Sequence, residues 1–145
     1  MATERYYTCK CTDRSYPGSL FDALVSFSAG NPTCADCGRR KNLHLVFEFG
    51  LGAGCRHCKV LAAFLPQELC SWKADDGDKV TFYPFLVILA TDDGDRSCWL
   101  PYWHVAEGRR RTRKTKYGQW APFINQAEFR SLLTQARKAG YRLGR

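Results

Sequence analysis

The sequence predicts an α+β fold: a small antiparallel sheet, built from a hairpin and a three-stranded meander, with one helix near each end. Three observations lead to this prediction. Apolar residues alternate over Leu43–Phe49, the two-residue period of a strand with one buried face. Asp-Gly turns within residues 75–78 and 92–95 separate further apolar runs, as in β-hairpins. Helix-capping patterns precede apolar residues at helical spacing near both ends.

The N-terminal half begins with an expected strand at residues 6–8. Ser19, with Asp22 three residues later, predicts a helix start, and Gly30 and Pro32 predict its end. The expected buried face of this helix consists of Leu20, Phe21, Leu24, Val25 and Phe27. Residues 59–65 fit either a strand or a short helix, and the sequence leaves this open.

The C-terminal half contains the expected meander, with strands at residues 69–73, 79–90 and 96–105. Pro84 and Pro101 are expected at bulges or edges because proline has no N–H for the ladder. Residues 107–116 are polar and basic and predict a loop. Asn125 with Glu128 predicts the start of a helix that ends near Gly140. Its expected apolar face consists of Phe129, Leu132, Leu133 and Ala136.

Length and composition favour a single globular domain of 145 residues. Within it we distinguish a cysteine-rich part (1–68), the meander (69–106) and a basic loop with the C-terminal helix (107–145). No apolar run approaches the roughly 18 residues of a membrane span, and the first residues lack a signal-peptide pattern. We therefore expect a soluble, cytoplasmic protein without a membrane partner. In a reducing compartment its eight cysteines would bind a metal, act in catalysis or be buried.

Two Cys-x-x-Cys pairs, Cys34/Cys37 and Cys55/Cys58, flank the alternating apolar run. Each pair can offer two sulfurs to one ion at about 2.3 Å, and a hairpin would bring the pairs together. Gly38, directly after Cys37, suits a tight turn. The arrangement resembles the zinc-ribbon superfamily over roughly a sixth of the chain. This resemblance implies a structural zinc, and four thiolates around one ion leave no open position for a substrate, so we expect no catalysis at the metal.

Other uses of the cysteines stay open. Cys9 and Cys11 can replace Cys55 and Cys58 as partners of the pair at 34 and 37, and His57 can stand in for a cysteine. Alternatively, residues 54–59 resemble the active-site turn of thioredoxin-like oxidoreductases, which implies a helix start at Cys55 and a lowered thiol pKa there. The remaining cysteines, which are Cys70 and Cys98, lie in expected strands, where a free cysteine is commonly a small buried residue.

Positive charge is concentrated at the C-terminal end. Residues 107–145 contain eleven Lys or Arg against two Glu, a balance of +9 in a chain whose net charge is +8. Six of these cations lie within residues 109–116, and such a run stays solvated unless a polyanion neutralises it. We therefore predict contact with the phosphates of DNA or RNA. The expected contacts are Arg109, Arg110, Arg111, Arg113, Lys114 and Lys116; the alternative is a solvated loop.

Aromatic residues flank the basic run on both sides. Trp99, Tyr102 and Trp103 precede it in the meander and are expected in the core, whereas Tyr117 and Trp120 follow it and are candidates for stacking on bases. The sequence thus predicts a non-catalytic zinc-binding protein whose basic region contacts nucleic acid. The alternatives are a zinc-stabilised module that binds a protein partner in a larger assembly, and a thiol oxidoreductase that uses Cys55 and Cys58.

Overall fold

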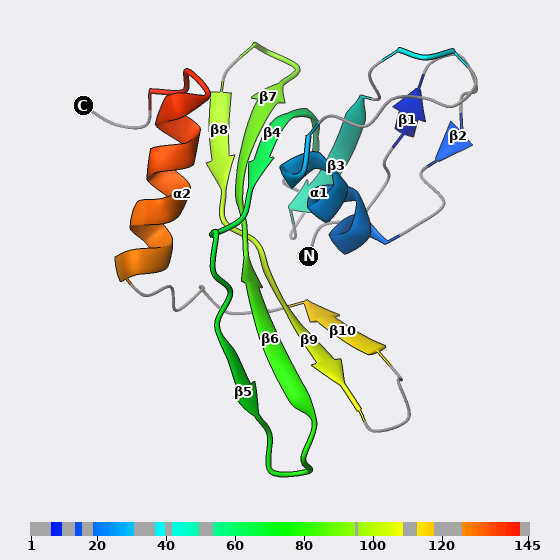
Figure 1. The fold of residues 1–145 in the computed structure, drawn as a ribbon. Helices are drawn as coiled ribbons and strands as arrows, with labels where there is room; N and C mark the ends of the chain where they lie inside the picture. The colour runs from blue at the N-terminus through cyan, green and yellow to red at the C-terminus, as the bar shows by residue number, and fades with distance from the viewer. Residues whose placement is uncertain are drawn as a thin grey trace. The chain divides into compact units, whose positions relative to one another are not determined.

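The structure is a computed structural model, and Figure 1 shows its fold. It describes residues 7–9, 14–15, 19–30, 37–39, 42–49, 54–94, 96–108, 113–117 and 126–142. Within this set, only the backbone is described at residues 7–9, 14–15, 47–49, 54–56 and 126. The predicted α+β class is confirmed, with one helix near each end. In place of one small sheet, however, the described residues form two four-stranded antiparallel sheets and a short two-stranded ladder.

The chain divides into two compact units. The first contains Met1–Ala63 and Val87–Trp99, and the second contains Phe64–Leu86 and Leu100–Arg145. The expected meander, residues 69–106, therefore contributes strands to both units.

The first unit begins with strands β1 (Tyr7–Cys9) and β2 (Arg14–Ser15), which pair antiparallel. Helix α1 (Leu20–Ser28) follows, with Ser19 as its predicted N-cap. The Ser19 hydroxyl accepts from the Asp22 amide at 3.2 Å and donates to the Asp22 carboxylate at 2.7 Å, which satisfies an otherwise unpaired amide of the first turn. The expected apolar face of α1 is buried except for Val25, which is half-buried.

The sheet of the first unit has the order β3-β4-β7-β8. Its strands are β3 (Leu43–Phe49), β4 (Gly54–Phe64), β7 (Leu86–Thr91) and β8 (Arg96–Trp99). Strands β3 and β4 form the predicted hairpin, in an unbroken register that places Leu45 opposite Cys58. Because β4 runs without a break from Gly54, residues 59–64 are strand, and the helix start expected at Cys55 is wrong.

The second unit contains a sheet of order β10-β9-β6-β5 and helix α2 (Gln126–Lys138). The strands are β5 (Ser71–Lys73), β6 (Lys79–Pro84), β9 (Tyr102–Glu107) and β10 (Arg113–Tyr117). Helix α2 buries Leu132 and Ala136, and the Gln135 side-chain amide donates to the Leu65 carbonyl at 2.7 Å. Phe129, which was expected on the same buried face, is 42% exposed, so that part of the prediction is wrong.

The two long runs expected as single meander strands each break into two strands. Residues 79–90 supply β6 to one sheet and β7 to the other, and residues 96–105 likewise supply β8 and β9. The breaks fall next to Pro84 and Pro101, and the Phe85 amide donates to the Pro101 carbonyl at 2.8 Å. Proline offers no N–H to a ladder, so a strand that contains it is readily interrupted there.

The two Asp-Gly turns close the hairpins that the sequence predicts. Gly77 joins β5 to β6 with φ of 88°, and Gly94 joins β7 to β8 with φ of 86°. The Gly77 amide donates to the Ala74 carbonyl and the Gly94 amide to the Thr91 carbonyl, at 2.9 and 3.0 Å. Positive φ at these positions explains the preference for glycine. Neither of the two described helices is long and apolar enough to cross a membrane.

Candidate functional site

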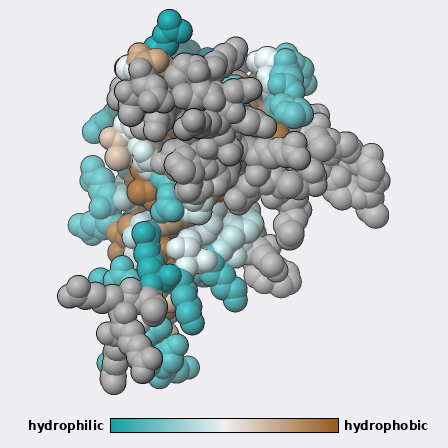
Figure 2. All heavy atoms as spheres, turned by 90° about the vertical axis from the view of Figure 1, so that its right-hand side faces the viewer, coloured by the Kyte–Doolittle hydropathy of each residue, from teal (hydrophilic) through white to brown (hydrophobic). Residues whose placement is uncertain are grey.

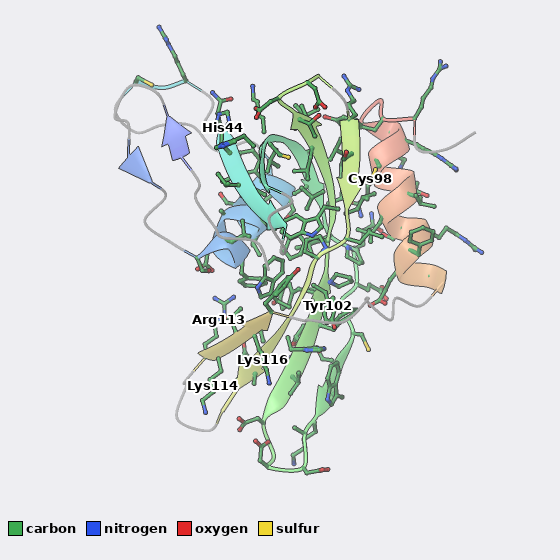
Figure 3. The ribbon with its side chains drawn as sticks, turned by 180° about the vertical axis from the view of Figure 1, so that it is seen from behind. His44, Cys98, Tyr102, Arg113, Lys114 and Lys116 are labelled. Atoms are coloured by element: carbon green, nitrogen blue, oxygen red, sulfur yellow. The ribbon has the colours of Figure 1, made fainter. Side chains whose placement is uncertain are left out.

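The described part of the basic segment is a strand. Residues 113–117 form β10, an edge strand that pairs with β9 through Arg113 opposite Glu107, Lys114 opposite Ala106 and Lys116 opposite His104 (Figure 3). The loop expected here is therefore wrong for residues 113–116. Backbone pairing with β9 gives these residues an ordered conformation although the strand has no buried side chain. Of the other predicted contacts, Arg109, Arg110, Arg111 and Trp120 lie outside the described residues.

The strand geometry separates the predicted cations into two sets. Successive side chains of a strand point to opposite faces, and residues opposite each other in a ladder share a face. Lys114 and Lys116 therefore lie on one face of the β10-β9-β6-β5 sheet, and Arg113 and Tyr117 lie on the other. We call the first of these the lysine face; by register it consists of Lys114, Lys116, Tyr102, His104, Ala106, Val80, Phe82, Pro84 and Trp72.

Aromatic rings gather on the lysine face around His104. The imidazole centroid lies 5.6 Å from the Trp72 ring, 5.5 Å from Phe82 and 5.6 Å from Tyr102. Phe82 and Tyr102 are also in ring contact, at 5.4 Å, and both are buried. Trp72 is 44% exposed. The cluster thus has a buried base formed by Phe82 and Tyr102, and Trp72 presents its indole to solvent.

The charge on the lysine face comes from Lys114 and Lys116. Burial lowers the pKa of His104 below its ordinary value of 6.5, and the neighbouring Lys116 ammonium lowers it further. His104 is therefore mainly neutral at pH 7, and the two exposed lysines provide most of the positive charge of this face. Among the described residues of the lysine face there is no carboxylate.

The opposite face of the same sheet has a different character. Trp103 and Val105 are buried there, and the Tyr117 ring packs on Trp103 at a centroid distance of 5.1 Å. The core position expected for Tyr102 and Trp103 is therefore confirmed, although they lie on different faces. The register also places a row of charged residues across this face: Arg113, Glu107, Lys79 and Lys73.

Figure 2 shows one side of the molecular surface. Hydrophilic residues (teal) cover much of the described surface in this view, with hydrophobic patches (brown) among them.

The cysteines proposed as metal ligands are only partly described. Cys37 is exposed in a turn and precedes Gly38, whose φ of 67° fits the tight turn that the sequence suggests. Cys58 is buried in β4. The backbone of Cys9 lies in β1 and that of Cys55 in β4, whereas Cys11 and Cys34 lie outside the described residues. Among the side chains that the structure describes, no three metal-ligating groups gather. The metal site stays a prediction.

The backbone distinguishes the two Cys-x-x-Cys segments. Around Cys37 it turns, whereas from Cys55 to Cys58 it is extended and keeps its register with β3. An extended segment lacks the turn through which a Cys-x-x-Cys pair presents both sulfurs to one ion. The exposed His57 lies within this same segment. This extended backbone therefore argues against Cys55 and Cys58 as a chelating pair.

Burial was predicted for Cys70 and Cys98, and this prediction is wrong because both are exposed. Cys98 lies in β8, and Cys70 directly precedes β5; each of these strands is at the edge of its sheet. Cys70 also lines a cavity of about 340 Å³ between residues 66–70 and the first turns of α2.

Trp72 is the residue of the lysine face that the sequence analysis did not select. A sequence signal was present: an aromatic residue between Ser71 and Lys73, in a run too short and polar to be a core strand. An aromatic side chain in such a run is more exposed than one in an apolar strand. Trp99, Tyr102 and Trp103 adjoin the basic run in sequence, whereas Trp72 reaches the lysine face only through the pairing of β5 with β6.

Comparison with protein-family models, with curated proteins and with solved structures gives no match for this chain.

Proposed function

We propose that this protein binds nucleic acid, DNA or RNA, without catalysis, and that the lysine face makes the contact. One observation carries the proposal: Lys114 and Lys116 are exposed on the same face as the half-exposed Trp72, and the described part of that face has no carboxylate. A surface with cations, an accessible aromatic ring and no negative charge complements a polymer of phosphates and bases.

The surrounding sequence adds to this complementarity. Arg109, Arg110 and Arg111 directly precede β10 in the chain, within a C-terminal region whose charge balance is +9. Each Lys or Arg that neutralises a phosphate releases condensed counterions, and this release drives association at low salt. Binding should therefore weaken steeply as salt is added.

Binding to labelled oligonucleotides tests the proposal, with the two faces of one sheet as mutual controls. The test variant is Lys114→Gln/Lys116→Gln. The control variant is Lys73→Gln/Lys79→Gln, which removes the same charge from exposed positions of the opposite face. Fluorescence anisotropy is measured with strands of about 20 nucleotides, longer than the roughly 4–16 nucleotides that one sheet-based domain covers.

We expect the wild type and the control variant to show similar plots of log K against log salt. The test variant should lose two phosphate contacts, which reduces the slope by about 1.4 for single strands at roughly 0.7 per contact. Equal weakening by the two variants would show that only net charge matters and would overturn the assignment to the lysine face. Absence of binding by the wild type at low salt would overturn the function itself.

The main alternative is a module that docks on an acidic protein surface. The same lysines would serve it, but a folded acidic partner releases few condensed counterions, so its salt dependence should be shallow. The oxidoreductase alternative has lost its physical premise, because Cys55 lies in β4 and has no helix N-terminus to lower its pKa.

We also propose that a structural zinc ion stabilises the cysteine-rich region. The turn at Cys37 and the positive φ of Gly38 support this proposal, and the extended backbone of β4 favours Cys9, Cys11, Cys34 and Cys37 as the ligands. Elemental analysis of the purified protein tests it. We expect one zinc per chain in the wild type, loss in Cys11→Ser and Cys37→Ser, and retention in Cys58→Ser. Cys98→Ser is the matched control, an exposed thiol outside both ligand sets.

Two results would overturn parts of this zinc proposal. Loss of zinc from Cys58→Ser, with retention in Cys11→Ser, would select the set Cys34, Cys37, Cys55 and Cys58. A folded wild type without bound metal would remove the zinc proposal altogether, and it would leave the proposed role of the lysine face untouched.

A further inference from the structure

Trp72 and Lys114 lie at opposite ends of one row across the lysine face. The register places Lys114 opposite Ala106, Ala106 opposite Val80, and Val80 opposite Trp72. Strands in a sheet are about 4.8 Å apart, so three steps separate the ends of this row by about 14 Å. The two residues between them have small apolar side chains and are half-buried. The Lys114 ammonium and the Trp72 indole therefore lie at the two ends of a strip of small apolar side chains.

The indole is held in place from one side. Its ring meets the His104 imidazole edge to face, at 81°, and His104 in turn contacts the buried Phe82 and Tyr102. This support restricts the rotation of the indole and lowers the entropy that stacking on a ligand would cost. The exposed part of Trp72 thus rests on packed aromatic rings whose base is buried.

We infer that the lysine face takes single-stranded nucleic acid, with a base stacked on Trp72 and the phosphates of the same strand neutralised by Lys114 and Lys116. This inference rests on the proposed function and names its ligand class. In a duplex the faces of the bases are hidden by stacking, so an exposed indole on a sheet gains nothing from it. In a single strand the bases are accessible, and each base has a π-face that an aromatic side chain can cover.

The chemistry assigns separate roles to the two kinds of residue. Lys114 and Lys116 act on the phosphates and set the salt dependence, whereas Trp72 acts on a base and contributes a part of the affinity that salt does not screen. His104 is a positioning residue, because it contacts the indole and leaves the ligand to Trp72. The two roles can therefore be measured independently in one binding assay.

The test compares Trp72→Ala and the conservative Trp72→Phe with the wild type, on a single strand and on a duplex of the same sequence. We expect the wild type to prefer the single strand. Trp72→Ala should weaken single-strand binding by roughly 5- to 150-fold, the equivalent of one lost base stack, and leave the salt slope unchanged. Trp72→Phe should retain most of the affinity because phenylalanine still offers a ring. Duplex binding should be the same for all three proteins.

Tryptophan fluorescence gives a second readout that does not depend on affinity. The chain has four tryptophans, and Trp72 is more exposed than the described Trp99 and Trp103. Saturation with a single strand should quench the fluorescence of the wild type, and most of this quenching should be missing in Trp72→Phe. The far-UV circular dichroism of each variant checks that the sheet is intact.

The outcomes separate this inference from the proposed function. If the wild type binds duplex and single strand equally, or if Trp72→Ala binds as tightly as the wild type, the stacking role is overturned; the phosphate role still stands if Lys114→Gln/Lys116→Gln lowers the salt slope. If the wild type binds an acidic polypeptide such as poly-glutamate and binds no oligonucleotide, the partner is a protein, and both proposals fall.

Discussion

Helix α2 allows a stability prediction in which two neighbouring apolar residues should behave differently. Leu132 is 0% exposed, whereas Phe129, three residues earlier, is 42% exposed. Truncation of a buried leucine to alanine costs about 2–5 kcal/mol, because the lost transfer energy adds to the energy of the cavity. Leu132→Ala should therefore lower the free energy of unfolding by an amount within this range.

For Phe129→Ala the expected change is much smaller. Full burial of a phenylalanine contributes roughly 1.5–3 kcal/mol, and the buried part of Phe129, somewhat more than half, therefore contributes about 0.9–1.7 kcal/mol. Alanine has a higher helix propensity than phenylalanine, and this difference offsets up to about 0.5 kcal/mol of the loss in stability. The net cost is therefore roughly 0.4–1.7 kcal/mol, below the range expected for Leu132→Ala, even though phenylalanine is the larger residue.

Urea denaturation of both variants, followed by circular dichroism, measures these free energies, and hydrogen exchange of the α2 amides reports the same change within the helix itself. With a slope of roughly 1–3 kcal/mol per molar urea, a loss of about 2–5 kcal/mol should lower the midpoint of Leu132→Ala by roughly 0.7–5 M. The reasoning is refuted if Phe129→Ala is the more destabilised of the two, or if Leu132→Ala unfolds at the wild-type midpoint.

Three further predictions follow from single sites. Gly94→Ala should lose about 1–2 kcal/mol, because φ at this position is 86° and no neighbour crowds an added Cβ; Gly94→Asn, measured in the same urea assay, should recover part of the loss. Because the pKa of His104 is lowered from 6.5, its contribution to stability should be fully present well above pH 6.5 and should fall as the pH drops through 6.5 toward the lower folded-state pKa, while affinity for oligonucleotides rises as the lysine face gains charge. His104→Gln should remove the part of both trends that His104 causes, as measured by pH-dependent unfolding and binding titrations. A thiol reagent should modify Cys70 and Cys98 in the folded protein but reach Cys58 only after unfolding, and mass spectrometry of the labelled peptides would contradict this if Cys58 reacts at the same rate.

Local patterns predicted the elements that depend on local chemistry. The N-cap at Ser19, the strand from Leu43 to Phe49 and both Asp-Gly turns are where the sequence indicates them. In each case the deciding interaction lies within a few residues: a side chain that caps an amide, an alternating apolar pattern, or a glycine that tolerates positive φ. These interactions do not depend on how the rest of the chain folds, so the local sequence is enough to predict them.

Errors arose where the partner of a segment is distant in the sequence. The segment 113–117 has no apolar period because it is an edge strand with every side chain exposed, and its pairing with β9 determines its conformation. Apolar spacing alone also placed Phe129 on the buried face of α2, although burial depends on which elements cover each helical turn. Pro84 and Pro101 were expected at bulges or edges of one meander, but Pro84 ends the interior strand β6 and Pro101 lies between β8 and β9. The sequence could not show that the chain passes from one sheet to another at these two prolines.

In the candidate site, too, some features depend on the local sequence and others on pairing with distant segments. The cationic stretch is visible in the sequence, and so is the expectation that it contacts a polyanion. The register of β10 with β9 determines the face on which each cation lies. It places Lys114 and Lys116 on the same face as His104, and Tyr117 on the opposite face. Trp72 belongs to the site because two further ladders carry the row to β5. A count of charges cannot show such a row.

Lysines on an edge strand have a second explanation that must be weighed against binding. Charged side chains at a sheet edge prevent pairing with another chain, and this protection alone would account for Lys114 and Lys116. Edge protection, however, requires charge along the strand and is indifferent to face, so Arg113 would serve as well as either lysine. Edge protection also does not explain why the half-exposed indole of Trp72 lies on the lysine face, on β5, three strands away from Lys114. A contribution of Trp72 to single-strand affinity is therefore the observation that distinguishes a binding surface from a protected edge.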